Sequence, residues 1–108
     1  MANINQVTFT GNLLDDSRLN QTLRGDYVLN WTTAITDRRR GHETGSWEEQ
    51  TTCVECAMFG QRVKGLSKKL VKGAKIGVKG KLRSQEILDE NNHRKHEVSV
   101  YVEEIDFL

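Results

Sequence analysis

Apolar and polar side chains alternate most clearly over residues 74–83. Ala74, Ile76, Val78 and Leu82 share one parity, and the other parity is cationic at Lys75, Lys79, Lys81 and Arg83. A period of two predicts a strand with one buried face and one exposed face. The cationic face indicates either a polyanion partner such as nucleic acid or an edge strand that its lysines protect from aggregation.

Weaker alternation predicts further strands on both sides of this one. They are expected over residues 7–11, 27–36, 51–59 and 98–102, and the cationic strand is expected to continue to Ile87. In the third strand Val54, Cys56 and Met58 fall on the predicted core side. Phe59 falls on the opposite side, which favours a functional role for its ring.

One short helix is expected between the third and fourth strands. Val63, Leu66 and Leu70 follow one another at offsets of three and four, and Gly73 stands where a helix stop is expected. Polar residues predict a loop over 15–26, a long charged connection over 37–46 and a hairpin tip over 89–92.

This order of elements describes an all-β fold with one short helix, the five-stranded Greek-key barrel called the OB-fold. Such barrels bind oligonucleotides or oligosaccharides on one face and its flanking loops. We expect the whole chain, residues 1–108, to form a single domain, because 108 residues suit one small unit. A domain of this size gains stability from association with further copies.

Net charge, hydropathy and the absence of catalytic motifs limit the classes of function that fit this sequence. The net charge is only +1, so a nucleic-acid interface has to come from the placement of charge rather than from its total. The sequence has no apolar run of membrane-spanning length and no signal-peptide pattern, which predicts a cytoplasmic protein without a membrane partner. No arrangement of nucleophile and base and no glycine-rich phosphate loop is present, so neither catalysis nor a cofactor is expected.

Paired cysteines and paired histidines in the sequence raise the question of a zinc site. Cys53 and Cys56 lie three residues apart, and His93 and His96 form a second pair. Residues three apart on a strand point to opposite faces, so the two cysteines cannot readily share a metal. The spacing to the histidines is not that of a zinc finger. We therefore expect no metal, and Cys56 is interpreted as a small core residue.

The ordered motifs of the chain resemble the DNA-binding domain of the bacterial single-stranded DNA-binding protein family. The similarity rests on short segments spread over nearly the whole chain: Ile4–Val7, Gly11–Leu13, Val28–Asn30, Gly45–Thr51, Met58–Gly60, Leu70–Gly73 and Val78–Arg83. The resemblance implies binding of single strands, with bases stacked on aromatic rings and cations along the phosphates. It also implies a homo-oligomer, most often a tetramer, in which the first strand pairs between subunits.

This chain differs from that family at the stacking positions. Arg39, Cys53 and Ile87 stand where tryptophans are common, and Glu55 stands on the presumed binding face where a basic residue is usual. Asn20 replaces a common arginine. We therefore expect charge to replace part of the stacking, with binding that is unusually sensitive to salt.

The candidate DNA-binding residues are cationic or aromatic. The cations are Arg38, Arg39, Arg40, Lys69, Lys72, Lys79, Lys81 and Arg83, and the rings are Phe59 and Trp47. For Trp47 two interpretations stay open, a stacking platform or a residue that packs the hairpin. Trp31 is expected in the core. Tyr101 is expected to be exposed or at a subunit contact and is not assigned to DNA.

The sequence predicts a protein that coats single-stranded DNA during replication, recombination or repair. Two alternatives remain: a dimeric primosomal adaptor of the same fold, and an interaction module that has lost DNA binding. Family members usually carry a flexible tail with an acidic tip, whereas this sequence ends at Leu108 directly after the last strand. We therefore expect no acidic tail for recruiting repair proteins, whether the tail was removed or the chain is a tailless paralogue.

Overall fold

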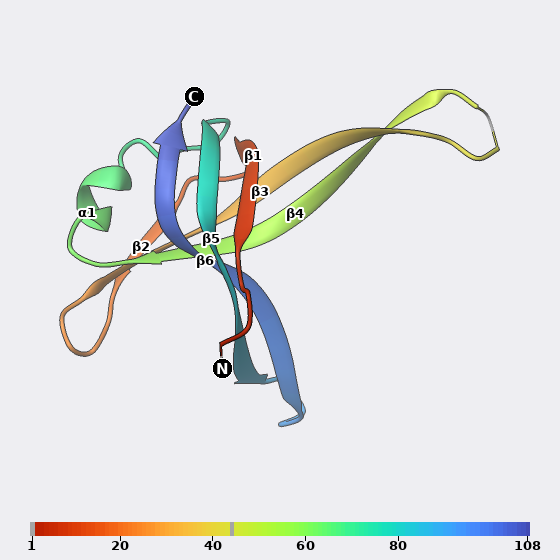
Figure 1. Cartoon of the computed structure of the whole chain (residues 1–108). Helices are drawn as coiled ribbons and strands as arrows, with labels where there is room; N and C mark the ends of the chain where they lie inside the picture. The colour runs from red at the N-terminus through yellow and green to blue at the C-terminus, as the bar shows by residue number, and fades with distance from the viewer. Residues whose placement is uncertain (1, 44) are drawn as a thin grey trace.

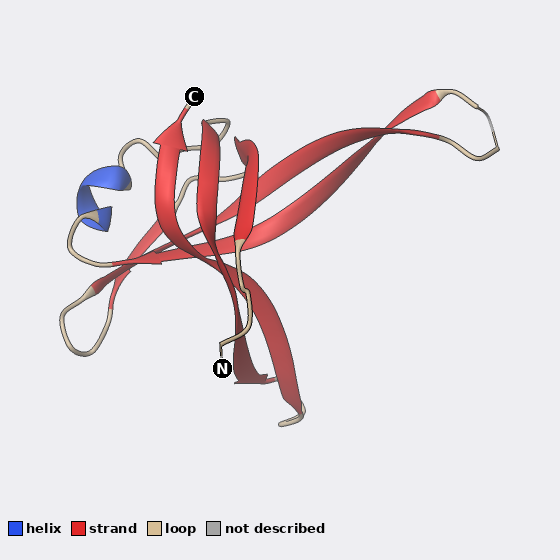
Figure 2. Cartoon of the chain, in the orientation of Figure 1, coloured by secondary structure: helices blue, strands red, loops and turns tan. Residues whose placement is uncertain are grey.

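The computed structural model describes residues 2–43 and 45–108. Its elements in chain order are β1 (Val7–Leu13), β2 (Arg18–Gln21), β3 (Tyr27–Arg40), β4 (Trp47–Phe59), α1 (Val63–Leu66), β5 (Lys75–Leu88) and β6 (Arg94–Phe107). Strands form almost all of the regular structure, and α1 lies at one side of them (Figure 2). The predicted all-β class with one short helix is confirmed for the described residues.

The strands close into the predicted Greek-key barrel. Their order is β1-β5-β6-β4-β3-β2, and β1 also pairs with β3, which joins the two ends of the barrel. All pairings are antiparallel except a short parallel contact between β4 and β6, where Ala57 lies opposite Tyr101. β2 adds to the outside of β3 and takes no part in the closure.

Two glycines allow the strands to approach closely enough for this closure. A Cβ atom on Gly11 would lie 2.4 Å from the carbonyl oxygen of Ala34, at the β1–β3 junction. A Cβ atom on Gly80 would lie 2.1 Å from the carbonyl oxygen of Tyr101, where the β5–β6 register shifts. A side chain larger than hydrogen cannot fit at either position without movement of the backbone.

The core follows the predicted alternation over the barrel. Trp31 is fully buried, as predicted, and Cys56 and Met58 point inward while Phe59 on the same strand is 36% exposed. The Trp31 indole donates a hydrogen bond of 2.9 Å to the Thr33 hydroxyl, so this buried polar pair is satisfied.

Two long hairpins extend beyond the barrel in different directions (Figure 1). The prediction of a long connection over 37–46 is wrong, because β3 and β4 stay paired out to Arg40 and Trp47 and leave only a short tip. Thr44 of that connection lies outside the described residues. The last strand is likewise longer than the predicted 98–102, since it pairs with β5 out to Arg94.

The cationic strand loses its predicted burial pattern where it leaves the barrel. Ile76 and Val78 are buried, but Leu82 is 51% exposed because the β5–β6 hairpin has no layer packed behind it there. The predicted tip over 89–92 is confirmed as a turn, in which the Asp89 carboxylate accepts hydrogen bonds from the backbone of Asn91 and His93.

Two further predictions of local structure need correction. The predicted loop over 15–26 contains β2, whose four residues are all exposed and therefore show no alternation. The helix covers only Val63–Leu66, and Leu70 is buried from the turns that follow it.

Candidate nucleic-acid interface

A groove of about 770 Å³ runs between the bases of the two hairpins, over the outer surface of β4 and β6. Its lining includes the aromatic rings of Phe59 and Tyr101, the small side chains of Ala57 and Ser99, and the cationic side chain of Arg83. The splayed hairpins produce this shape, because β4 and β6 pair at only two positions before they diverge. From this point the β3–β4 and β5–β6 hairpins extend in different directions (Figure 1).

The aromatic part of the groove is a contiguous pair of rings. The Phe59 and Tyr101 ring centroids are 5.5 Å apart with an interplanar angle of 19°, and the Arg83 guanidinium lies 4.8 Å from the Tyr101 centroid. Stacking and cation–π attraction hold the three groups together without hydrogen bonds. Such an arrangement presents π surface beside a fixed positive charge, which suits an unpaired base and its phosphate.

The other cations of β5 continue from Arg83 along the same side of the strand. Lys81 lies opposite Tyr101 in the β5–β6 ladder, so the two side chains share a face. Lys79 precedes it by two residues and is also exposed. The structure thus brings Phe59 and Arg83 together in the lining of the groove. Lys81 and Lys79 lie on the same face of β5 but outside that lining.

The β3–β4 hairpin divides its candidate residues between two faces. Register pairs Thr32 with Glu55, which lines the groove, and the same parity includes Arg38, Arg40 and Trp47 further out. Arg39 pairs with Glu48 and has the opposite parity, so it lies on the other face of the hairpin. Trp47 is 71% exposed, which leaves its ring open to a ligand and does not fit a packing role within the described part of the hairpin.

Lys69 and Lys72 lie away from the groove. The Lys69 ammonium is 5.8 Å from the centre of the Phe107 ring, and the Lys72 backbone donates a 2.8 Å hydrogen bond to the Asp16 carboxylate. Neither residue lines the groove. The sequence analysis predicted Lys69 and Lys72 as part of one DNA-binding set with the cations of β5. In the fold they lie apart from the groove that Arg83 lines.

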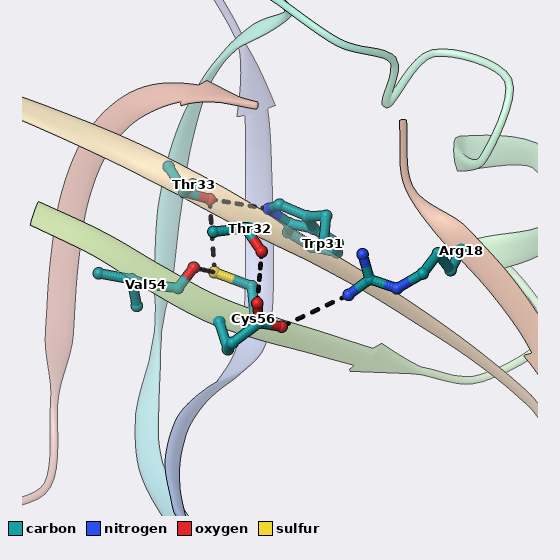
Figure 3. A network of polar contacts seen from close by, with 7 residues as sticks. Arg18, Trp31, Thr32, Thr33, Val54 and Cys56 are labelled. Carbon is teal, nitrogen blue, oxygen red and sulfur yellow. Dashed lines mark hydrogen bonds and ion pairs between the residues drawn. The ribbon is translucent and has the colours of Figure 1, made fainter. Parts of the chain in front are cut away.

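The Glu55 carboxylate on the groove does not face it as an uncompensated charge. Arg18 of β2 forms an ion pair of 3.4 Å with it, and the Thr32 hydroxyl donates a hydrogen bond to its other oxygen (Figure 3). The Arg18 side chain is half-exposed, so one guanidinium offsets the Glu55 charge beside the path of a ligand. The sequence placed Glu55 on the presumed binding face but gave no sign of this partner.

Behind the groove surface, the Cys56 thiol points into the core. Its sulfur lies 3.5 Å from the Thr33 hydroxyl. Figure 3 shows the thiol and the hydroxyl pointing toward one another. Burial raises the pKa of the Cys56 thiol to about 11, an effect that the Thr33 hydrogen bond reduces and the nearby Glu55 charge reinforces. Cys53 is exposed on the opposite side of β4, so the two cysteines do not converge. No group of three or more potential metal ligands occurs among residues 2–43 and 45–108.

Two groove residues escaped the sequence analysis. Tyr101 was expected to be exposed or at a subunit contact, yet it is half-buried against Phe59. Its parity gave the outward direction, but the parallel β4–β6 contact that places it beside Phe59 is a property of the fold. Arg18 lay in the presumed loop, where no alternation assigned its side chain to a face.

The comparisons with known proteins agree with this geometry. The model of the Single-strand binding protein family matches residues 4–108. The chain belongs to this family. The single-stranded DNA-binding protein of Mycobacterium bovis is 28% identical over 106 residues, which are 97% of this chain and 65% of that protein. The protein of the same name from Borreliella burgdorferi is 29% identical over 97% of this chain and 70% of its own length. The chain thus spans between 63% and 65% of the length of the mycobacterial relatives it matches.

Solved structures of family members have the same barrel. A Plasmodium falciparum SSB in complex with ssDNA superposes with a TM-score of 0.88 over 100% of this chain and 97% of its own, at 19% identity, which concerns the fold alone. A deletion mutant of the single-stranded DNA binding protein from Thermus aquaticus gives a TM-score of 0.83 at 27% identity, over 97% of this chain and 50% of its own. In the described part of this chain, no helix has the length and apolar character needed to cross a membrane.

Proposed function

We propose that this protein binds single-stranded DNA with little sequence preference, in the groove between the two hairpins. The observation that supports this most directly is the Phe59–Tyr101 ring pair with the Arg83 guanidinium beside it. A base that stacks on such rings contributes about 1–3 kcal/mol whatever its identity, because every base has a π face. Membership in the single-strand binding protein family supports the same conclusion and favours it over the primosomal adaptor and over a module without DNA binding.

The strand is proposed to lie along the groove and out over the β3–β4 hairpin. Phe59 and Tyr101 stack bases, while Arg83, Lys81 and Lys79 neutralise phosphates from β5. Arg38, Arg40 and Trp47 extend this surface along the same face of the β3–β4 hairpin. Arg39, Lys69 and Lys72 belong to an outer set, which a longer strand meets only where it leaves the groove. Counterion release from these cations supplies much of the affinity.

The proposed biological role is to coat and protect exposed single strands in replication, recombination or repair, within the bacterial cytoplasm or nucleoid. The protein acts by binding alone, as one domain, without catalysis or a cofactor. We propose that it works as a homo-oligomer, a tetramer or a dimer. A mass measurement in solution separates these two states.

Titration of labelled oligothymidine at several salt concentrations, beside a duplex of equal length, tests the proposal. Tight binding to the single strand at low salt, weakening steeply as salt rises, is expected, with much weaker binding to the duplex. Absence of binding at low salt, or equal affinity for both nucleic acids, would contradict the proposal.

A further inference from the structure

The strand register places five residues in one row across the outer surface of the barrel. From β5 to β2 they are Lys81, Tyr101, Ala57, Asn30 and Arg18, each the direct partner of the next in the sheet. Direct partners on neighbouring strands point to the same face of the sheet. Tyr101, Ala57 and Asn30 all line the groove. The row therefore crosses the groove and has a cation at each end.

The length of this row suits a short stretch of single strand. Four spacings between neighbouring strands separate the backbones of Lys81 and Arg18, which is about 19 Å. An OB-fold typically binds about 4–16 nucleotides, so a strand that crosses the rings is long enough to reach both ends of the row. Arg83, the cation in the groove lining, lies on the β5 side. Arg18 adds a cation on the β2 side.

Arg18 is held toward the groove by an ion pair that is open to water. Its guanidinium donates a 3.4 Å hydrogen bond to the carboxylate of Glu55, which lines the groove. The two side chains are 53% and 57% exposed, and a pair so exposed contributes little to stability. Exchange of this carboxylate for a phosphate is therefore inexpensive. Glu55 then keeps the hydrogen bond from the Thr32 hydroxyl.

Resting on the proposed function, we propose that Arg18 binds a phosphate of the single strand at the β2 end of this row. The strand passes from Lys81 over Tyr101 and Asn30 to Arg18, beside the base of the β3–β4 hairpin. In the free protein Glu55 accepts from the guanidinium, and a phosphate takes that place in the complex. β2, which takes no part in closing the barrel, thereby contributes to binding.

Salt titrations of oligothymidine binding by Arg18→Gln test this contact. We expect the log–log salt slope to fall by about 0.7, the value for one phosphate contact on a single strand. Arg18→Lys keeps the charge and is expected to keep most of the slope. Arg24→Gln makes the same change of charge in the exposed turn after β2, beyond the row, and is expected to leave the slope at the wild-type value.

A Glu55→Gln background separates a phosphate contact from mere compensation of the Glu55 charge. If Arg18 only offsets Glu55, adding Arg18→Gln to Glu55→Gln leaves the slope unchanged. A phosphate contact predicts that the slope still falls by about 0.7 in the double variant. Thermal melting checks that each variant stays folded.

The results also separate this contact from the proposed function. An unchanged slope on adding Arg18→Gln to Glu55→Gln, or an equal loss of slope in Arg24→Gln, would overturn the Arg18 contact while leaving single-strand binding intact. Failure of the wild-type protein to bind oligothymidine would instead remove the proposed function, and the Arg18 contact with it.

Discussion

The Arg83 guanidinium lies 4.8 Å from the centre of the Tyr101 ring and lines the same groove. Tyr101 in turn stacks on Phe59, so β4, β5 and β6 each contribute one side chain to a continuous surface. Because the cation is held against a ring, it keeps its place beside the π surface without a carboxylate that would cancel its charge. This arrangement links stacking and phosphate neutralisation at one point of the groove.

Replacing Phe59 or Tyr101 by alanine is expected to weaken oligothymidine binding by about 1–3 kcal/mol each. The two rings touch, so the double variant should lose less than the sum of the single losses. Phe107→Ala serves as the control, because that ring is 42% exposed and lies off the groove. An equal loss in Phe107→Ala, or loss of cooperative melting in Phe59→Ala, would show that the rings act through stability instead.

The salt dependence of binding reports on the cations of β5. Lys81→Gln and Arg83→Gln should each reduce the log–log salt slope by about 0.7, the value for one phosphate contact on a single strand. Lys68→Gln makes the same change of charge outside the proposed interface and should leave the slope unchanged. An equal reduction of the slope in all three variants would mean that net charge determines the salt dependence and that the placement of the charge does not.

Intrinsic fluorescence can separate the two tryptophans. Trp31 is fully buried whereas Trp47 is 71% exposed on the face of the β3–β4 hairpin that leads to the groove. Addition of oligothymidine is therefore expected to quench the emission of Trp47, and Trp47→Phe should abolish the quenching. Persistent quenching in Trp47→Phe would assign the signal to Trp31 and leave Trp47 without a role in stacking.

The barrel was predictable from the sequence because its strands keep one face in the core. Cys56 and Met58 are buried and Phe59 is exposed, as the alternation in the sequence predicts. Trp31 and Leu29, two residues apart on β3, are both buried. The hairpins were less predictable, since residues such as Leu82 and Arg38 lie where both faces meet solvent and burial no longer selects a parity. β2 was missed for the same reason.

The candidate site was predictable only within single strands. The alternation of β5 identified Lys79, Lys81 and Arg83 as one surface, and the parity of Phe59 separated it from the core. The contact of Phe59 with Tyr101 depends on the parallel pairing of β4 with β6, strands that are far apart in the sequence. The compensation of Glu55 by Arg18 likewise needs β2 beside β3.

Closure of the barrel at Gly80 can be tested without DNA. Gly80→Ala would place a Cβ atom 2.1 Å from the Tyr101 carbonyl oxygen, so we expect a loss of unfolding free energy of about 1–3 kcal/mol or more. At Gly77 in the same strand the nearest atom to a new Cβ is 3.8 Å away, so Gly77→Ala should change stability far less. Equal stabilities of the two variants in urea denaturation would contradict the close approach.

The central claim is that a single strand lies against Phe59 and Tyr101, and photo-crosslinking tests it most directly. Oligonucleotides that contain 5-iodouracil are irradiated in complex with the protein, and mass spectrometry then identifies the attached residues. We expect adducts at Phe59, Tyr101 and Trp47, at reduced yield in Arg83→Gln. Adducts confined to Phe107 or Tyr27, rings that do not line the groove, would place the strand elsewhere and contradict this account.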